Sequence, residues 1–263
     1  MDSNKGKYFF MRKNFSNSSY VNEYNKRFRE TVPLISKRIF AGIYSLLLFF
    51  ANYFFMPLLY LFTKAKNLLH RLVFRHFGFG NRVPKTIWEK QFNTGAWDYL
   101  ESKNEAQHYQ AIIKFFDQLK SKKSVLDIGC GKGVLYKYLK ENGSLPGIEY
   151  RGIDLSENAT SAAIQRFPGI NFQQLDFEKK NVEKKFDVII FNESLYYFPL
   201  PLSILDKCYS QNLNDNGVFI ISMFDYPGHN EIWQKIAKHY QVIMEEEVKN
   251  DKGEKWKIKL LQK

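Results

Sequence analysis

The sequence contains little that could bind a metal or form disulfides. Its two cysteines, Cys130 and Cys208, are too few for a disulfide framework, and neither begins a C-x-x-C pattern. A reducing, cytosolic setting is therefore the simplest expectation. No group of His and Asp residues has the spacing of a ligand set, so we expect no metal site and no metal-dependent mechanism.

Acidic residues are scarce in the first third of the chain and balanced afterwards. Residues 1–90 contain 16 Lys and Arg against four Asp and Glu, whereas residues 91–263 contain 23 of each class. An enzyme acting on nucleic acid would carry its basic face on the domain that binds the substrate. We therefore expect no nucleic-acid partner and assign the basic excess to the N-terminal region.

Charged residues are absent from one long segment, residues 39–63, which contains 25 consecutive uncharged residues. As a helix this segment would be roughly 37 Å long, enough to cross a hydrocarbon core of about 30 Å. The run begins too late and is too long for a cleavable signal peptide. It predicts a hydrophobic membrane segment preceded by a basic, flexible arm, residues 1–38.

The geometry of this membrane segment stays open. Residues 1–38 and 64–90 each carry a net charge of +6, so the distribution of basic residues does not orient a single span. A re-entrant hairpin or an in-plane helix would keep both basic flanks on one anionic membrane surface. Residues 64–90 mix basic and apolar side chains and predict an amphipathic linker in the headgroup region.

The remaining residues, 91–263, alternate between helix and strand patterns, which predicts an α/β domain with a largely parallel sheet. The last two strands are separated by the short turn NDKGE and predict an antiparallel edge hairpin. Helices are expected at 105–120, 132–142, 157–166, 202–211 and 229–239, and strands at 124–128, 149–153, 170–175, 186–191 and 217–223, followed by the hairpin.

The segment VLDIGCGKG, residues 125–133, places a glycine-rich turn directly between a buried strand and a helix. Such a turn lets the backbone approach a ligand closely and presents the N-terminus of the helix to it. Val134 occupies the place where the dinucleotide fingerprint G-x-G-x-x-G has its third glycine, which disfavours an NAD-linked oxidoreductase. Asp154 and the pair Asp176-Phe177 follow the next two strands.

The motifs VLDIGCGKG, RGIDLS, QLDF and FDVIIFNESLYYF together resemble those of class I S-adenosylmethionine (SAM)-dependent methyltransferases. The resemblance covers roughly residues 90–263 and implies a Rossmann-like, seven-stranded sheet with an antiparallel terminal hairpin. The segments NESLYYF and GAWDYLESKNEAQHY are also similar to nodulation-type N-methyltransferases that act on chitooligosaccharides. The N-terminal membrane-associated helical segment is a departure from that group.

The resemblance implies SAM as the cofactor and assigns roles to the loop residues after the strands. The ribose and adenine would contact Asp154, Leu155, Asp176 and Phe177. The methionine part would contact the glycine turn and Asn192, and three aromatic residues could either form a lid or pack on the sheet. The expected cofactor residues are Asp127, Gly129, Cys130, Gly131, Gly133, Asp154, Leu155, Asp176, Phe177 and Asn192, and the aromatic residues are Trp97, Tyr99 and Tyr109.

Glu193 and His229 follow the fourth and fifth strands and are the candidate catalytic bases for an acceptor that must lose a proton. Either could have another role, Glu193 as a cofactor contact and His229 as a helix-start residue. His108 and His239 are expected to face solvent.

We expect methyl transfer to an O or N atom of a small-molecule, glycan or lipid-linked acceptor, by a membrane-associated protein whose catalytic domain is cytoplasmic. A catalytically silent, membrane-tethered subunit is the alternative.

Overall fold

The computed structural model describes residues 56–120 and 122–263, and the chain divides into two compact units, residues 1–65 and 66–263. The predicted arm, residues 1–38, and residues 39–55 of the predicted membrane segment lie outside the described residues. Within the described ranges, no helix is both long and apolar enough to span a bilayer. Residues 56–63 and the start of the predicted linker belong to one helix, α4 (Met56–Leu72).

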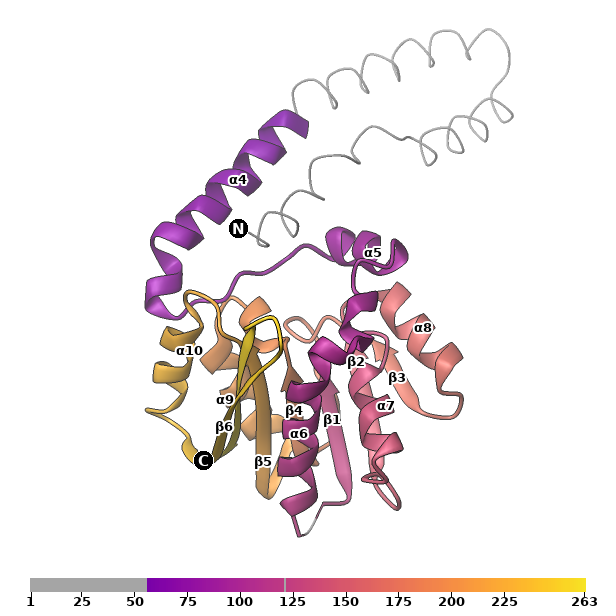
Figure 1. Cartoon of the computed structure of the whole chain (residues 1–263). Helices are drawn as coiled ribbons and strands as arrows, with labels where there is room; N and C mark the ends of the chain where they lie inside the picture. The colour runs from indigo at the N-terminus through magenta and orange to yellow at the C-terminus, as the bar shows by residue number, and fades with distance from the viewer. Residues whose placement is uncertain (1–55, 121) are drawn as a thin grey trace, which may run out of the picture. The chain divides into compact units, whose positions relative to one another are not determined.

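The second unit is built on a seven-stranded sheet with the order β3-β2-β1-β4-β5-β7-β6 (Figure 1). The first five strands along the chain pair in parallel, and β7 pairs antiparallel with both β5 and β6. This is the Rossmann-like sheet with a terminal hairpin that the sequence predicts. The strands are β1 (Ser124–Ile128), β2 (Glu149–Asp154), β3 (Asn171–Gln174), β4 (Phe186–Asn192), β5 (Leu213–Phe224), β6 (Gln241–Lys249) and β7 (Lys255–Gln262).

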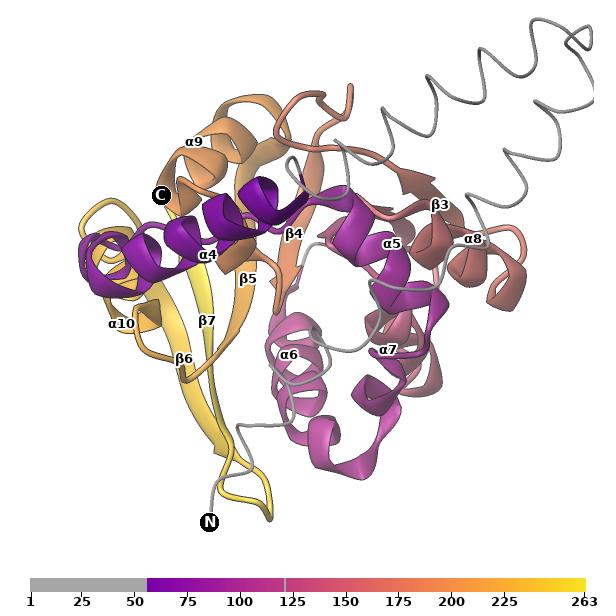
Figure 2. The ribbon, with the colours of Figure 1, turned by 90° about the horizontal axis from the view of Figure 1, so that it is seen from above.

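Helices cover both faces of this sheet (Figure 2). The helices α6, α7 and α8 bury side chains against one face, and α9 and α10 against the other. The main helices of this unit are α5 (Lys85–Asn93), α6 (Ala106–Gln118), α7 (Val134–Glu141), α8 (Glu157–Arg166), α9 (Pro201–Gln211) and α10 (His229–Ile236), with short 3-10 turns η3 (Phe74–Phe77), η4 (Asp98–Glu101), η5 (Lys103–Glu105) and η6 (Leu195–Tyr197).

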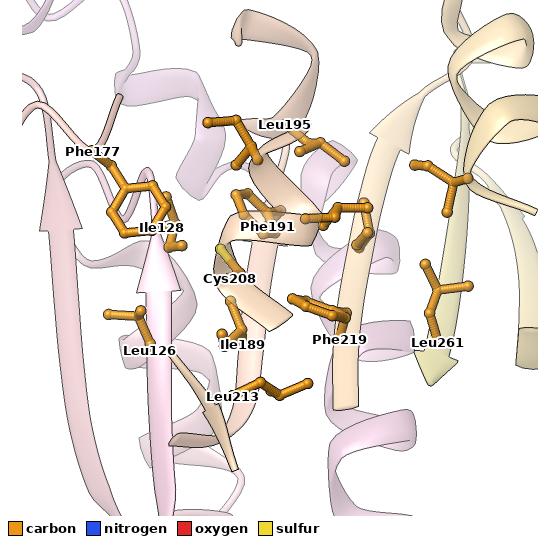
Figure 3. Close-up of a cluster of buried hydrophobic side chains, with 14 of the residues drawn as sticks. Leu126, Ile128, Phe177, Ile189, Phe191, Leu195, Cys208, Leu213, Phe219 and Leu261 are labelled. Atoms are coloured by element: carbon orange, nitrogen blue, oxygen red, sulfur yellow. The ribbon is translucent and has the colours of Figure 1, made fainter. Parts of the chain in front are cut away.

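The strand sequences are apolar at successive positions because both faces of the sheet are buried. Along β4, Val188 and Ile190 pack under α6 and α7, whereas Ile189 and Phe191 pack under α9 (Figure 3). This alternation follows from the two-residue repeat of a strand. Because β1 to β4 pair in parallel, their carboxyl ends meet at one edge of the sheet, between the two helical layers.

Two helix starts illustrate how local sequence sets the elements at this edge. The hydroxyl of Ser156 accepts a hydrogen bond from the Ala159 amide at 3.2 Å, which caps α8. Pro201 occupies the first turn of α9, where its missing N–H leaves no hydrogen bond unmade. β5 begins at Leu213, four residues before the predicted start, because Leu213 pairs with Phe186 ahead of an irregularity in the ladder.

Candidate functional site

The glycine-rich turn joins β1 to α7 and lines a cavity at the carboxyl edge of the sheet. Gly129 and Gly131 have positive φ values of 86° and 54°. A Cβ atom on Gly129 would collide with the side chain of Ser194, so this position needs glycine for space as well as for backbone conformation. The turn is held in place because the Gly129 and Cys130 amides both donate to the Ile153 carbonyl, at 2.8 and 3.0 Å.

Gly133 differs from the other predicted residues of the turn. It begins α7 with φ 75°, and it does not belong to the cavity lining. A Cβ atom there would lie 3.1 Å from ring atoms of Phe167 and Phe172. Gly133 therefore packs below the turn, and its contact with the cofactor stays a prediction.

Asp154 ends β2 and lies in the cavity wall beside the turn. Its Oδ2 accepts the Gly131 amide at 2.9 Å, and its Oδ1 accepts the Ser156 amide at 2.8 Å. Burial raises the pKa of this carboxyl to about 6, although the two backbone hydrogen bonds act in the opposite direction. The carboxylate is thus fixed in orientation and keeps lone pairs for a ligand. Leu155 lines the cavity next to it.

Asp176 and Phe177 follow β3 and also line the cavity. Phe177 is a buried core residue whose ring lies 4.3 Å from the Lys207 ammonium. Asp176 forms an ion pair with Arg82 at 2.8 Å, and the same guanidinium contacts Glu178. Arg82 lies 94 residues earlier in the chain and was not expected at the site. Its charge offsets the two acids at this end of the cavity.

Glu193 follows β4 in a left-handed backbone conformation, φ 55°, which is uncommon for a residue with a side chain. Its Oε1 accepts the Ser222 hydroxyl, and its Oε2 accepts the Phe224 amide and the Tyr196 hydroxyl, each at 3.0 Å. Burial raises the pKa of Glu193 to about 8. All three partners are neutral, so this buried carboxyl can titrate near neutral pH at the cavity wall.

Two buried polar atoms in the cavity wall have no hydrogen-bond partner among the described residues: Oδ1 of Asn192 and Oδ1 of Asp127. The other oxygen of Asp127 accepts the Tyr150 hydroxyl at 2.5 Å, and burial raises the pKa of this carboxyl to about 7. Buried polar atoms are nearly always paired in native proteins. Two unpaired acceptors beside the glycine turn fit a ligand that brings its own donors, such as an ammonium group.

Aromatic side chains close the cavity on the side of α5. Trp88 and Phe92 line it, and the ring of Trp88 lies 5.4 Å from Trp97 and 4.8 Å from Tyr197. Trp97 in turn lies 5.9 Å from Tyr99. Trp97 and Tyr99, two of the residues predicted as a lid, pack behind these rings and do not line the cavity themselves. The rings that do line it include Trp88 and Phe92, which were not predicted from the sequence although their spacing of four residues on a helix gave a signal.

Tyr109, the third predicted lid residue, is a core residue that reaches the cavity. It is almost fully buried in α6, and its ring stacks on Tyr138 at 4.5 Å. Its position matches the alternative expectation, aromatic packing on the sheet. His108, its neighbour, is fully buried and stacks on Trp256 at 5.2 Å. The expectation that His108 faces solvent is therefore wrong, because α6 turns this side chain toward the sheet.

His229 does not belong to the cavity lining. Its Nδ1 hydrogen-bonds the Phe224 carbonyl at 2.7 Å, and its ring stacks on Tyr196 at 4.3 Å. Burial lowers the pKa of His229, which favours the neutral ring. His229 therefore lies against Tyr196, whose hydroxyl donates to Glu193, and its role as a base stays a prediction.

The cavity also extends across the predicted domain boundary at residue 90. Arg82, Val83 and Trp88 all line it. Glu89 accepts the amides of Glu157 and Asn158 at 2.7 and 3.0 Å, and so binds α5 to the start of α8. Residues 82–89 therefore supply part of the cavity wall, although they lie before the predicted domain start at residue 91.

Residues 99–252 match the methyltransferase domain family, so more than half of the chain is covered and the protein belongs to this family. This match agrees with the resemblance of the motifs to class I SAM-dependent methyltransferases. The sequence is 27% identical over 154 residues to malonyl-[acyl-carrier protein] O-methyltransferase of Acetivibrio thermocellus, covering 57% of this chain and 53% of that protein.

Two further similarities support the family and the fold. The chain is 33% identical over 115 residues to ubiquinone biosynthesis O-methyltransferase of Pasteurella multocida, covering 38% of this chain and 46% of that protein. The chain thus spans about half the length of these curated relatives. The N-methyltransferase NodS of Bradyrhizobium japonicum WM9, solved with S-adenosylhomocysteine, superposes with a TM-score of 0.57 at 15% identity, covering 67% of this chain and 96% of NodS.

Proposed function

We propose that this protein transfers the methyl group of SAM to an O or N atom of a small-molecule, glycan or lipid-linked acceptor presented at a membrane. The observation that carries the proposal is the meeting of four strand ends around one cavity. Asp154, Asp176 and Asn192 line this cavity together with the glycine turn, and Glu193 closes one end of it.

Each of these groups suits one part of the cofactor. The fixed carboxylate of Asp154 would accept the ribose hydroxyls, and Asp176 would accept the adenine amino group beside Phe177. The unpaired oxygens of Asn192 and Asp127 would accept the ammonium group of the methionine part. When bound, SAM supplies a methyl group on a sulfonium that is electrophilic enough for direct displacement.

Glu193 is the group best placed to take a proton from the acceptor. Three of the lone-pair positions of its carboxylate are used by neutral protein donors, which leaves room for one donor from the acceptor. A base with a pKa near the working pH is effective in proton transfer. His229 acts as a positioning residue, since it stacks on Tyr196 and Tyr196 donates to Glu193.

The membrane context of the acceptor rests on the N-terminal sequence. An uncharged run of 25 residues between two flanks of +6 would hold the enzyme at an anionic membrane surface, with the catalytic unit in the cytoplasm. Confinement to that surface would raise the local concentration of enzyme near a membrane-held acceptor. The balanced charge of residues 91–263 supports a small acceptor over a nucleic acid.

The proposal is tested with the purified full-length protein and SAM labelled in its methyl group. Membrane lipid extracts and soluble metabolite extracts would be offered as separate acceptor pools, with Asp154→Ala as the inactive control. We expect label in a product from the lipid pool. Label transfer only to soluble metabolites would remove the membrane part of the proposal, and equal transfer by both proteins would remove the assigned cofactor site.

A further inference from the structure

Six large apolar side chains are exposed within ten residues at the junction of α4 and η3. They are Leu68, Leu69, Leu72, Val73, Phe74 and Phe77. Leu72 and Phe77 are 62% and 60% exposed, values unusual for side chains of this size clustered together. Arg71 is exposed within the same stretch. We call residues 66–77 the docking face.

Two polar side chains of α4, Lys66 and His70, fix the orientation of the docking face relative to residues 79–82. The Lys66 ammonium donates to the Arg82 carbonyl at 2.7 Å, and Nε2 of His70 hydrogen-bonds the Phe79 carbonyl at 3.0 Å. Residues 66 and 70 are one helical turn apart, so both lie on the same side of α4. Leu68 and Leu72 lie on another side, one turn apart from each other, and the contacts of Lys66 and His70 keep them turned away from residues 79–82.

The docking face leads directly into the wall of the cavity. The Gly80 and Asn81 amides donate to the Pro199 and Tyr196 carbonyls at 3.1 and 2.9 Å, beside the loop that carries Glu193. The next residues, Arg82 and Val83, line the cavity itself. A surface that bound the docking face would therefore lie close to the edge of the sheet where the cavity is found.

The charge of this region restricts what could cover it. From residue 66 to residue 88 the sequence contains no acidic residue, while Arg71 and Arg75 lie within the exposed apolar stretch. A partner must therefore offer apolar surface and negative charge together. An anionic bilayer has both, because apolar side chains enter the boundary below the headgroups while basic side chains remain among the phosphates.

We propose that residues 66–77 dock the catalytic unit onto an anionic lipid bilayer and so turn the cavity toward the membrane surface. This inference deepens the proposed function, since it rests on a membrane-held acceptor, but it assigns a second contact on the catalytic unit that is separate from residues 39–63. Each basic residue near an anionic surface contributes about fivefold to binding. Docking should accordingly weaken when phosphatidylglycerol is omitted or salt is added.

Single cysteines on the full-length chain test this arrangement. The two native cysteines, Cys130 and Cys208, are buried, so an environment-sensitive dye would react at an introduced site. Leu69→Cys, Leu72→Cys and Phe77→Cys probe the docking face. Ile164→Cys on α8 is the matched control, because Ile164 and Leu69 are both 48% exposed. Each labelled protein would be reconstituted in phosphatidylcholine vesicles with and without phosphatidylglycerol.

We expect blue-shifted emission, and quenching by nitroxide-labelled lipids, at the three docking-face positions but not at position 164. The effect should be larger with phosphatidylglycerol, and Arg71→Gln combined with Arg75→Gln should reduce docking by about 25-fold. The proposal would be overturned if the labels at all three docking-face positions showed the same emission and the same lipid quenching as the label at position 164. A blue shift that depends on protein concentration without vesicles would assign the face to a second copy of the chain and also overturn it.

SAM binding by the same labelled proteins separates this inference from the proposed function. Intact SAM binding with no lipid contact at the docking face would defeat the docking proposal alone. Lipid contact at the docking face by a protein that binds no SAM would defeat the proposed function and leave the docking result standing.

Discussion

Two parts of the cavity wall differ in how they are encoded. The part formed by the ends of β1 to β4 consists of residues that end a buried strand, such as Asp154 and Asn192, or follow one closely, such as Asp176. The other part, formed by residues 82–92, is joined to the strand ends through tertiary contacts, for example from Arg82 to Asp176 across 94 residues. The first part can be read from local sequence. The second cannot, because it lines the cavity only once the chain has folded.

The largest expected effect falls on the strand-end part, at Glu193. Because its pKa is raised to about 8 by burial and a base acts when ionised, kcat/KM should rise with pH through about 8 and level off above it. Glu193→Gln should lower kcat/KM by roughly 10²- to 10⁴-fold and flatten this dependence. A pH–rate profile of both proteins with a common acceptor checks this. An unchanged profile in the variant would show that Glu193 is not the base.

The raised pKa of Glu193 also predicts how the free energy of unfolding changes with pH. A carboxyl whose pKa is higher in the folded protein than in the unfolded chain stabilises the fold at low pH, and this contribution is lost as pH rises toward and through about 8. Denaturant unfolding should therefore show the wild type losing stability between about pH 5 and pH 9 relative to Glu193→Gln. Parallel curves for the two proteins would contradict the raised pKa.

The strand-end part also depends on the glycine turn. Gly129→Ala adds a Cβ atom that collides with Ser194 at positive φ, so we expect a loss of about 2–5 kcal/mol in unfolding free energy. Gly147→Ala is the control, since Gly147 has φ +73° but no atom within 4 Å of the added Cβ. It should lose only about 1–2 kcal/mol. Equal losses in urea titrations would mean that close approach to Ser194 is unimportant.

Most of the fold and the strand-end part of the site could be predicted from the sequence. Strands alternate with helices, a glycine turn follows β1, and acidic residues stand at the end of β2 and after β3. Periodicity and local motifs are therefore sufficient to predict these features. His229 and Gly133 could not be placed this way, because the side on which a loop residue lies depends on packing. His229 is turned behind Tyr196, and Gly133 is packed under Phe167. Residues 82–89 were assigned to a linker because their partners are distant in sequence.

Truncation tests whether residues 82–89, in the other part of the cavity wall, contribute to SAM binding. A protein comprising residues 91–263 lacks Arg82, Trp88 and Glu89, whereas one comprising residues 66–263 keeps them. We expect the shorter protein to bind SAM about 10- to 100-fold more weakly, judged from the loss of one buried aromatic contact. Calorimetry on both proteins, with circular dichroism to confirm folding, measures this. Equal affinities would show that residues 82–89 cover the cavity without contributing to binding.

The smallest effect is expected at Arg82 alone. Its side chain is 31% exposed, so its ion pair with Asp176 is partly screened by solvent. Arg82→Gln should weaken SAM binding by about 1 kcal/mol or less, and the difference should shrink at high salt. Tighter binding by the variant would reverse the interpretation, because it would mean that Arg82 competes with the adenine amino group for Asp176.

The assignment of the cofactor site is tested most directly by the affinity of Asp154→Ala for SAM. The Asp154 carboxylate is fixed by the Gly131 and Ser156 amides and is assigned two ribose hydroxyls. Calorimetric titration of the full-length variant should show a loss of about 2–4 kcal/mol in binding free energy, with an unchanged far-ultraviolet circular dichroism spectrum. An affinity within about twofold of the wild type, in a folded protein, would contradict the cofactor site described above.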